Sequence, residues 1–329
     1  MNESSLTSTA DAWSDLTTPT MKWVFRGLFS TILFLGLVGN GAVCSAIVLK
    51  QRLRTTANML VLNLAAADFV FVALYAPTQL SFFENNYSWE MGDGVCKLTY
   101  TVLPACLCAT VETLLCIAVI RYKAVASPFR LRLGMTYKTT AVVISVIWLT
   151  SLLTGLPVLL LAKTVQYQDR VFCDEIWPVG KPYREVYWVF IFLIQYAIPL
   201  LAIILLSIAT IVKVKQSRTR VIPSAPSINN EANSVSHVLQ ANVRQRQRRE
   251  INMSKMLTGL VILYAICMLP QHVVFFWLTY GNLKQQEYSL YIFTIANMFP
   301  IANSALNPLI YGSLHKELKS GFKNCIKCS

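Results

Sequence analysis

Seven stretches of about 20 or more mainly apolar residues follow one another along this chain of 329 residues. A bilayer core about 30 Å thick is crossed by about 20 helical residues. Only helices and closed barrels cross it, because lipid cannot satisfy free backbone groups. We therefore expect an all-α membrane protein, a seven-transmembrane helix bundle whose two ends lie on opposite sides. The expected spans are 23–49, 57–83, 95–124, 138–162, 183–213, 253–280 and 287–311.

The distribution of basic residues predicts the orientation of the bundle. Of the 29 Lys and Arg residues, 21 fall in the gaps after the first, third and fifth spans and in the C-terminal tail. Short cytoplasmic loops are enriched in Lys and Arg. The other side has 8 basic and 11 acidic residues. We therefore expect a multi-pass protein of the plasma membrane, with its N-terminus extracellular and its C-terminus cytoplasmic.

The formal net charge of +13 follows from this topology. Because the charges flank apolar spans, they favour anionic lipid headgroups as neighbours, and no nucleic-acid partner is expected. We divide the chain into an extracellular tail (1–22), the bundle (23–311), and a short amphipathic eighth helix with a cytoplasmic tail (312–329). The cytoplasmic loop of about 214–250 is rich in polar residues, and we predict that it is mobile. Asn2 and Asn86 begin glycosylation sequons on the predicted outside.

Several polar residues lie inside the predicted spans, where an ionisable group costs about 2.5–3.5 kcal/mol. One carboxylate is accompanied by hydroxyl and amide groups that are able to meet as a single cluster. Two interpretations are open: a hydrogen-bonded clamp between helices, or a site for a small hard cation such as sodium, for which an oxygen-only set is suited. Glu112 has no evident partner and is assigned a structural role. The members of the cluster are Asn40, Asp68, Thr110, Asn303, Ser304 and Asn307.

Each span also carries a short motif, and the motifs occur in one fixed order. They are Gly39-Asn40, Leu64-Ala65-Ala66-Ala67-Asp68, Trp89-x-x-Gly92 with Cys96, Arg121-Tyr122, Trp148, Pro199, Cys267-x-x-Pro270 and Asn307-Pro308-Leu309-Ile310-Tyr311.

This ordered set resembles the rhodopsin-like (class A) G-protein-coupled receptors over residues 25–325 or so. The resemblance implies a disulfide between Cys96 and Cys173 in the second outer loop, and palmitoylation of Cys325 and Cys328. Cys96 precedes Arg121 by 25 residues, about 37 Å of helix. That distance places the cysteine and the arginine at opposite membrane surfaces.

The resemblance also narrows the ligand. Leu103 stands where amine receptors of this family carry an aspartate, and the seventh span has no lysine to hold retinal. The second outer loop resembles that of receptors for short amidated neuropeptides, the neuropeptide FF, neuropeptide Y and tachykinin group. The acidic excess outside favours a cationic peptide, and Asp174 with Glu175 are candidates to accept an arginine bidentately. The alternative is that they are solvated loop charges.

The expected pocket has an aromatic and apolar wall with a few polar groups, which suits the amidated aromatic end of a peptide. His272 has no companions able to complete a metal site, and the sequence shows no nucleophile–base–orienter set, so no enzyme activity and no cofactor beyond a possible allosteric sodium ion are expected. The candidate pocket residues are Gln79, Tyr100, Leu103, Leu107, Asp174, Glu175, Trp188, Gln271, His272, Phe275, Phe293 and Asn297.

Such receptors work by population shift, in which an agonist favours a state that opens the inner face to a heterotrimeric G protein or to arrestin. Four residues depart from the family pattern: Ile120, Met268, Tyr264 and Ser207. Ile120 leaves Arg121 without its usual adjacent acid, so we predict a pair between Arg121 and Glu250. The departures keep open a non-coupling or arrestin-biased scavenger receptor, with a transporter as a remote alternative. The predicted switch residues are Arg121, Tyr122, Glu250, Met268, Pro270, Asn307, Pro308 and Tyr311.

Overall fold

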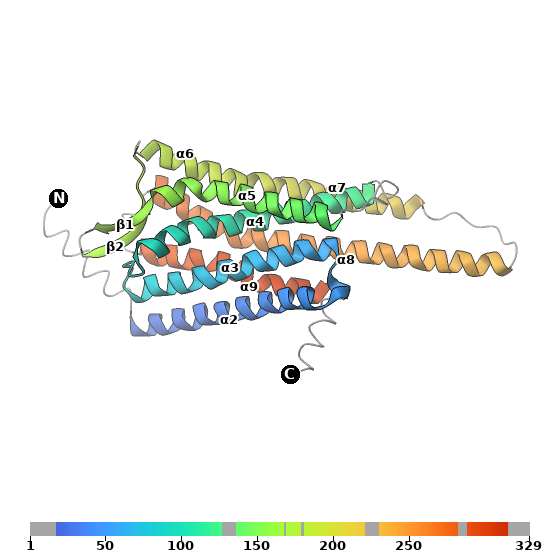
Figure 1. Ribbon diagram of the computed structural model, residues 1–329, viewed down its shortest axis with the longest axis horizontal. Helices are drawn as coiled ribbons and strands as arrows, with labels where there is room; N and C mark the ends of the chain where they lie inside the picture. The colour runs from blue at the N-terminus through green and yellow to red at the C-terminus, as the bar shows by residue number, and fades with distance from the viewer. Residues whose placement is uncertain are drawn as a thin grey trace.

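Seven helices long and apolar enough to cross a membrane lie side by side in the computed structural model (Figure 1). The structure describes residues 18–126, 136–167, 169–178, 181–220, 230–281 and 288–314. The expected spans are confirmed, since the segments long and apolar enough to cross a membrane begin and end within four residues of them, although some helices continue beyond the spans. The helices are α2 (Pro19–Leu49), α3 (Thr56–Glu84), α4 (Gly92–Ala126), α5 (Tyr137–Leu161), the fifth span made of α6 (Lys181–Phe192), η3 (Leu193–Ala197) and α7 (Ile198–Arg220), then α8 (Asn230–Tyr280) and α9 (Ser289–Leu314).

Threonine side chains begin three of these helices. The Oγ1 atoms of Thr18, Thr55 and Thr136 accept hydrogen bonds from main-chain N–H groups in the first turns of α2, α3 and α5. A hydroxyl at this position satisfies one of the backbone donors that a helix start leaves unpaired. A short 3-10 turn, η1 (Gln51–Leu53), joins α2 to α3.

A two-stranded antiparallel hairpin covers one end of the bundle, a feature that the sequence analysis did not predict. Strands β1 (Ala162–Tyr167) and β2 (Arg170–Glu175) pair with Thr164 opposite Cys173. Cys173 forms the expected disulfide with Cys96, near the start of α4. We call this end of the bundle the hairpin end, and the opposite end, where Arg121 lies, the arginine end (Figure 1).

The segment 214–250, which we predicted as a mobile loop, is helical over most of its length, and its mobility stays a prediction. Helix α7 continues to Arg220 and α8 begins at Asn230, so only residues 221–229 between them lie outside the described part of the chain. Helix α8 therefore extends well beyond the bundle (Figure 1). Residues 230–253 contain neither glycine nor proline and are rich in good helix formers, so a continuous helix is favoured there.

The core is packed tightly enough to require glycine where helices approach each other. A Cβ atom added at Gly39 in α2 would lie 2.9 Å from Cγ of Pro308 in α9. The two helices thus meet at the glycine of one family motif and the proline of another. The predicted amphipathic helix, Asn2, Cys325 and Cys328 lie outside the described residues.

Candidate functional site

Asp68 lies at the centre of the bundle with both carboxylate oxygens in use. Ser304 Oγ donates a hydrogen bond to Oδ1 and Asn307 Nδ2 donates one to Oδ2, and each donor–acceptor distance is 2.7 Å. Asn40 Nδ2 donates to the main-chain oxygen of Ser304 over 2.9 Å. Three helices, α2, α3 and α9, are therefore joined by the polar residues that the sequence singled out.

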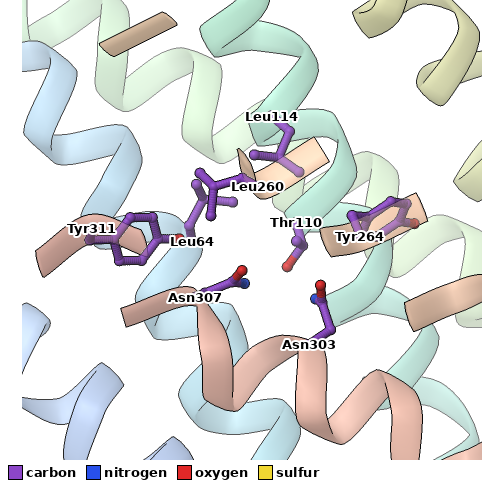
Figure 2. A pocket seen from close by; sticks show the side chains of 8 residues that line it. All are labelled: Leu64, Thr110, Leu114, Leu260, Tyr264, Asn303, Asn307 and Tyr311. Atoms are coloured by element: carbon purple, nitrogen blue, oxygen red, sulfur yellow. The ribbon is translucent and has the colours of Figure 1, made fainter. Parts of the chain in front are cut away.

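The two remaining members of the cluster, Thr110 and Asn303, line the same gap as Asn307, which is bonded to Asp68. The gap is narrow and has no room for a water molecule (Figure 2). The Oδ1 atoms of Asn40 and Asn303 are buried and have no hydrogen-bond partner among the described residues. This oxygen-only set fits a hard cation chemically. The hydrogen bonds to Asp68 equally form the interhelical clamp.

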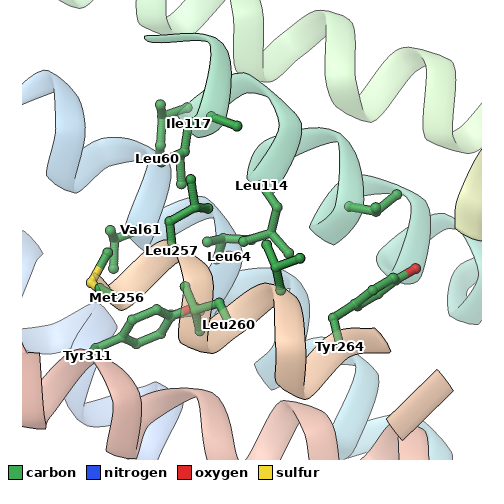
Figure 3. Close-up of a cluster of buried hydrophobic side chains, with 14 of the residues drawn as sticks. Leu60, Val61, Leu64, Leu114, Ile117, Met256, Leu257, Leu260, Tyr264 and Tyr311 are labelled. Atoms are coloured by element: carbon green, nitrogen blue, oxygen red, sulfur yellow. The ribbon is translucent and has the colours of Figure 1, made fainter. Parts of the chain in front are cut away.

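An apolar layer separates this cluster from the arginine end (Figure 3). Leu64 lies one helical turn from Asp68, and Ile117 lies one turn from Arg121. Both belong to one buried cluster with Leu257 and Tyr311, and Tyr311 is 0% exposed. The arginine end is therefore closed by this layer.

Arg121 is buried and lines a small gap with barely the room for one water molecule. Ser207 and Ser254 lie on the same gap, from α7 and α8. The buried Ser207 Oγ has no hydrogen-bond partner among the described side chains. Tyr122 is half-buried. The side chain of Glu250 lies outside the described residues, so its pairing with Arg121 stays a prediction.

The fifth and sixth spans exchange hydrogen bonds where η3 interrupts the regular helix. Tyr264 Oη donates to the Gln195 main-chain oxygen over 2.6 Å, and Tyr196 Oη donates to the Ala265 main-chain oxygen over 3.0 Å. A π-helical turn shifts the backbone pairing and is frequent at functional sites. Met268 is buried in the apolar cluster of the same region.

Glu112 has partners that the sequence did not reveal. Thr150 Oγ1 in α5 donates to its Oε2 over 2.8 Å, and Cys108 Sγ lies 3.4 Å from its Oε1. The hydroxyl of Thr150 also lies within 2.9 Å of two main-chain oxygens of its own helix. The embedded acid therefore joins α4 to α5, in agreement with a structural role.

At the hairpin end, Asp174 and Glu175 are bound by a residue that we did not predict for the site. Arg184 Nε donates to Glu175 Oε1 over 2.7 Å, and Arg184 Nη2 donates to Asp174 Oδ1 over 3.2 Å. Trp188 Nε1 donates to the same Glu175 oxygen over 2.6 Å. The Glu175 side chain is only 1% exposed. Glu175 is therefore a buried, paired carboxylate and not a solvated loop charge.

Aromatic side chains extend from this acidic cluster into the bundle. The rings of Trp188 and Phe275 lie 5.2 Å apart. The His272 ring lies 5.1 Å from Phe192 and 4.8 Å from Tyr196, neither of which the sequence analysis had selected. These rings pack against one another, and their role as the wall of a ligand pocket stays a prediction.

Three carboxamides from three helices form a chain across the same end of the bundle. Gln271 Nε2 in α8 lies 3.4 Å from Asn297 Oδ1 in α9, and Asn297 Nδ2 lies 3.4 Å from Gln79 Oε1 in α3. Asn297 is fully buried. These distances are near the upper limit for hydrogen bonds, so the bonds are weak and easily exchanged.

The other predicted pocket residues lie around this chain or apart from it. Tyr100 Oη donates to the Cys173 main-chain oxygen over 2.9 Å and so fixes the hairpin. Leu103 and Leu107 belong to the apolar core. Phe293 packs in a separate small cluster with Val274 and Ala296. Asn86 is exposed, and its Oδ1 accepts a hydrogen bond from Lys22 Nζ over 3.1 Å.

The family model described as "7 transmembrane receptor (rhodopsin family)" matches residues 39–311. Galanin receptor 2b of Danio rerio is 28% identical over 302 residues, which cover 92% of this chain and 74% of that receptor. Neuropeptide FF receptor 1 of Homo sapiens is 28% identical over 317 residues, covering 91% and 69%. A QRFP-like peptide receptor of Branchiostoma floridae is 26% identical over 310 residues, covering 92% and 77%.

Proposed function

The chain belongs to the rhodopsin family of seven-transmembrane receptors, and on that premise we propose that it is a receptor for a short amidated neuropeptide. It is a multi-pass membrane protein and not an enzyme. In the proposal the hairpin end is extracellular, with the N-terminus, and the arginine end is cytoplasmic. The cytoplasmic partners are a heterotrimeric G protein and arrestin.

The observation that carries the proposal is the carboxamide chain of Gln271, Asn297 and Gln79. A carboxamide both donates and accepts hydrogen bonds, whereas a carboxylate only accepts. A peptide that ends in a carboxamide is therefore able to join this chain by exchanging its weak bonds. A peptide with a free carboxylate has no donor for the amide oxygens and leaves one of them unpaired, which is costly in a buried site.

The surrounding side chains support the same class of ligand. The paired Trp188 and Phe275 rings, and the His272 ring against Phe192, offer an apolar surface for an aromatic residue next to the amide. The names of the relatives describe receptors for the peptides galanin, neuropeptide FF and QRFP. We extend the ligand class of these relatives, a neuropeptide, to this chain.

In the proposal, the receptor without agonist has the closed apolar layer of this structure. Agonist binding at the hairpin end favours an arrangement in which the layer around Leu257 and Tyr311 opens and Arg121 becomes accessible to the G protein. We propose that Asp68, Ser304, Asn303 and Asn40 would hold a sodium ion, for which the gap beside them must be wider than it is in this structure. The ion would supply a positive charge beside the buried carboxylate.

A second candidate function is a receptor that binds peptide without coupling efficiently. Ile120 stands next to Arg121 in place of an acid, and Ser207 replaces a tyrosine on the gap beside it. The two candidates predict the same ligand and differ in the response of the G protein.

A screen with paired peptides tests both. Cells that express the receptor are exposed to short amidated peptides, each with its free-acid twin, and G-protein dissociation and arrestin recruitment are recorded. We expect an amidated agonist whose free-acid twin is at least about tenfold weaker. Equal potency of the twins contradicts the proposal. Arrestin recruitment without G-protein dissociation selects the second candidate.

A further inference from the structure

The acidic cluster at the hairpin end contains one more negative charge than its described side chains neutralise. Asp174 and Glu175 are both acidic, and Arg184 is the one basic residue that forms salt bridges with them among the described residues. The cluster of these three side chains therefore has a formal charge of −1. A net charge on a buried group favours the binding of one further cation.

The acceptor that remains free to bind such a cation is a single oxygen of Glu175. Arg184 and Trp188 both donate to Oε1 of Glu175. The other oxygen, Oε2, is buried and has no hydrogen-bond partner among the described residues. An ionised carboxylate accepts several hydrogen bonds, and a buried oxygen without a donor is unfavourable. Oε2 is thus an acceptor that the protein holds in place and leaves unpaired.

The surroundings of Glu175 suit a cation more than a neutral donor. The Trp188 ring lies 5.3 Å from the Tyr187 ring and 5.2 Å from the Phe275 ring. Aromatic faces attract guanidinium and ammonium groups. Since Glu175 is almost fully buried, its attraction for a cation is screened less than that of an exposed acid.

We propose that Glu175 Oε2 binds one cationic group of the extracellular ligand, a guanidinium or an ammonium, while Arg184 remains on Oε1. The expected bidentate acceptance of a ligand arginine by Asp174 and Glu175 is replaced by this arrangement, because Arg184 already binds one oxygen of each acid. The ligand cation therefore approaches end-on with one N–H. The assignment of this cation to a peptide rests on the proposed function; the cation site itself does not.

Arg184 has a definite role in this site. Its side chain is 34% exposed, whereas that of Glu175 is 1% exposed, so the arginine lies on the solvent side of the carboxylate. It changes the charge of the acid pair from −2 to −1 and holds Oε1 away from the ligand. Arg184 is a positioning residue that limits the strength of cation binding.

The test uses Nα-acetylated arginine amide, called arginine amide below, as the probe and the purified full-length receptor in lipid nanodiscs. Thermal denaturation is followed against the concentration of arginine amide, of Nα-acetylated citrulline amide (citrulline amide below), which is uncharged, and of tetramethylammonium, which cannot donate a hydrogen bond. We expect a saturable stabilisation by arginine amide alone. In Glu175→Gln, which keeps the hydrogen bonds to Oε1, the apparent affinity falls by about tenfold or more.

Two further variants make the test specific. Glu185→Gln removes the same charge from the same region outside the cluster and is expected to leave the affinity unchanged. Arg184→Gln changes the charge of the cluster from −1 to −2 and is expected to tighten binding several-fold. If Glu175→Gln does not fold, Glu175→Asp withdraws the oxygen by one methylene and is expected to weaken binding.

The outcomes separate this inference from the proposed function. Retained affinity in Glu175→Gln or Glu175→Asp, equal stabilisation by citrulline amide, or weaker binding in Arg184→Gln overturns the cation site. A peptide screen without any amidated agonist overturns the proposed function and leaves the result with arginine amide standing.

Discussion

The hydroxyl of Tyr264 in α8 donates a 2.6 Å hydrogen bond to the main-chain oxygen of Gln195 in η3. Tyr196, the residue after Gln195, returns a bond to the main-chain oxygen of Ala265 over 3.0 Å. The fifth and sixth spans therefore hold each other through two reciprocal tyrosine–carbonyl bonds, at a position where the π-helical turn alters the backbone pairing. Between this contact and the arginine end, the apolar layer closes the bundle.

We predict that Tyr264→Phe raises basal signalling. The substitution keeps the ring and removes the donor, so the closed arrangement loses one buried hydrogen bond, about 1 kcal/mol or about a fivefold change in the equilibrium. Basal G-protein activation, normalised to surface expression, measures the change. Tyr280→Phe is the control, because Tyr280 Oη makes only a 3.4 Å bond at an exposed position. An unchanged or lower basal activity counts against the role of Tyr264.

The sodium proposal and the clamp interpretation of Asp68 predict different responses to salt. If sodium binds, the melting temperature of the wild-type receptor is higher in sodium chloride than in the same concentration of choline chloride, since a ligand of the folded state stabilises it. Asp68→Asn abolishes the difference, whereas Asp93→Asn, at the exposed hairpin end, keeps it. Equal melting temperatures of the wild type in the two salts leave the clamp as the function of Asp68.

A double-mutant cycle tests the pair of Glu112 and Thr150, because we expect the double variant to be more stable than Thr150→Val alone. Thr150→Val removes the hydroxyl donor of a membrane-embedded acid and is expected to lower stability by about 1–3 kcal/mol. Adding Glu112→Met removes the acid as well, and much of the loss is recovered because no buried polar atom stays unpaired. Thermal denaturation measures both, with Thr31→Val as the control, whose hydroxyl bonds only within α2. Additive losses would falsify the pairing.

Glu250 is predicted to restrain the closed state through Arg121. Glu250→Ala is expected to raise basal G-protein activation by severalfold, because removal of one partner of a buried ion pair is strongly destabilising. Glu231→Ala, the same change further along the same helix, serves as the control. Identical basal activity in the two variants argues that Arg121 is held by other residues.

Hydropathy and basic-residue density were sufficient to predict the seven spans, because the bilayer sets the length of each one. The contacts of Asp68 were also predictable in outline, since a buried carboxylate needs donors and few polar residues lie in the spans. The role of Arg184 was not. It precedes Trp188 by one helical turn, and only the folded hairpin brings Glu175 to both.

Two further features depended on tertiary structure in the same way. Thr150 and Glu112 lie on different helices, and their register follows from packing that the sequence does not display. The π-helical turn at Gln195 has a partial local signal, because Pro199 has no N–H to bond the Gln195 oxygen four residues earlier; the sequence marks a break in the regular helix there but not its π-helical form. The hairpin, too, has no strong turn motif between β1 and β2.

The most direct test of the central claim is the potency ratio of an amidated agonist to its free-acid twin, measured in the wild type and in Asn297→Leu. Asn297 is the middle member of the carboxamide chain. The account predicts a ratio of at least about tenfold in the wild type that falls towards one in the variant, because the discriminating donor and acceptor are removed. A ratio that is the same in both receptors contradicts recognition of the amide by this chain.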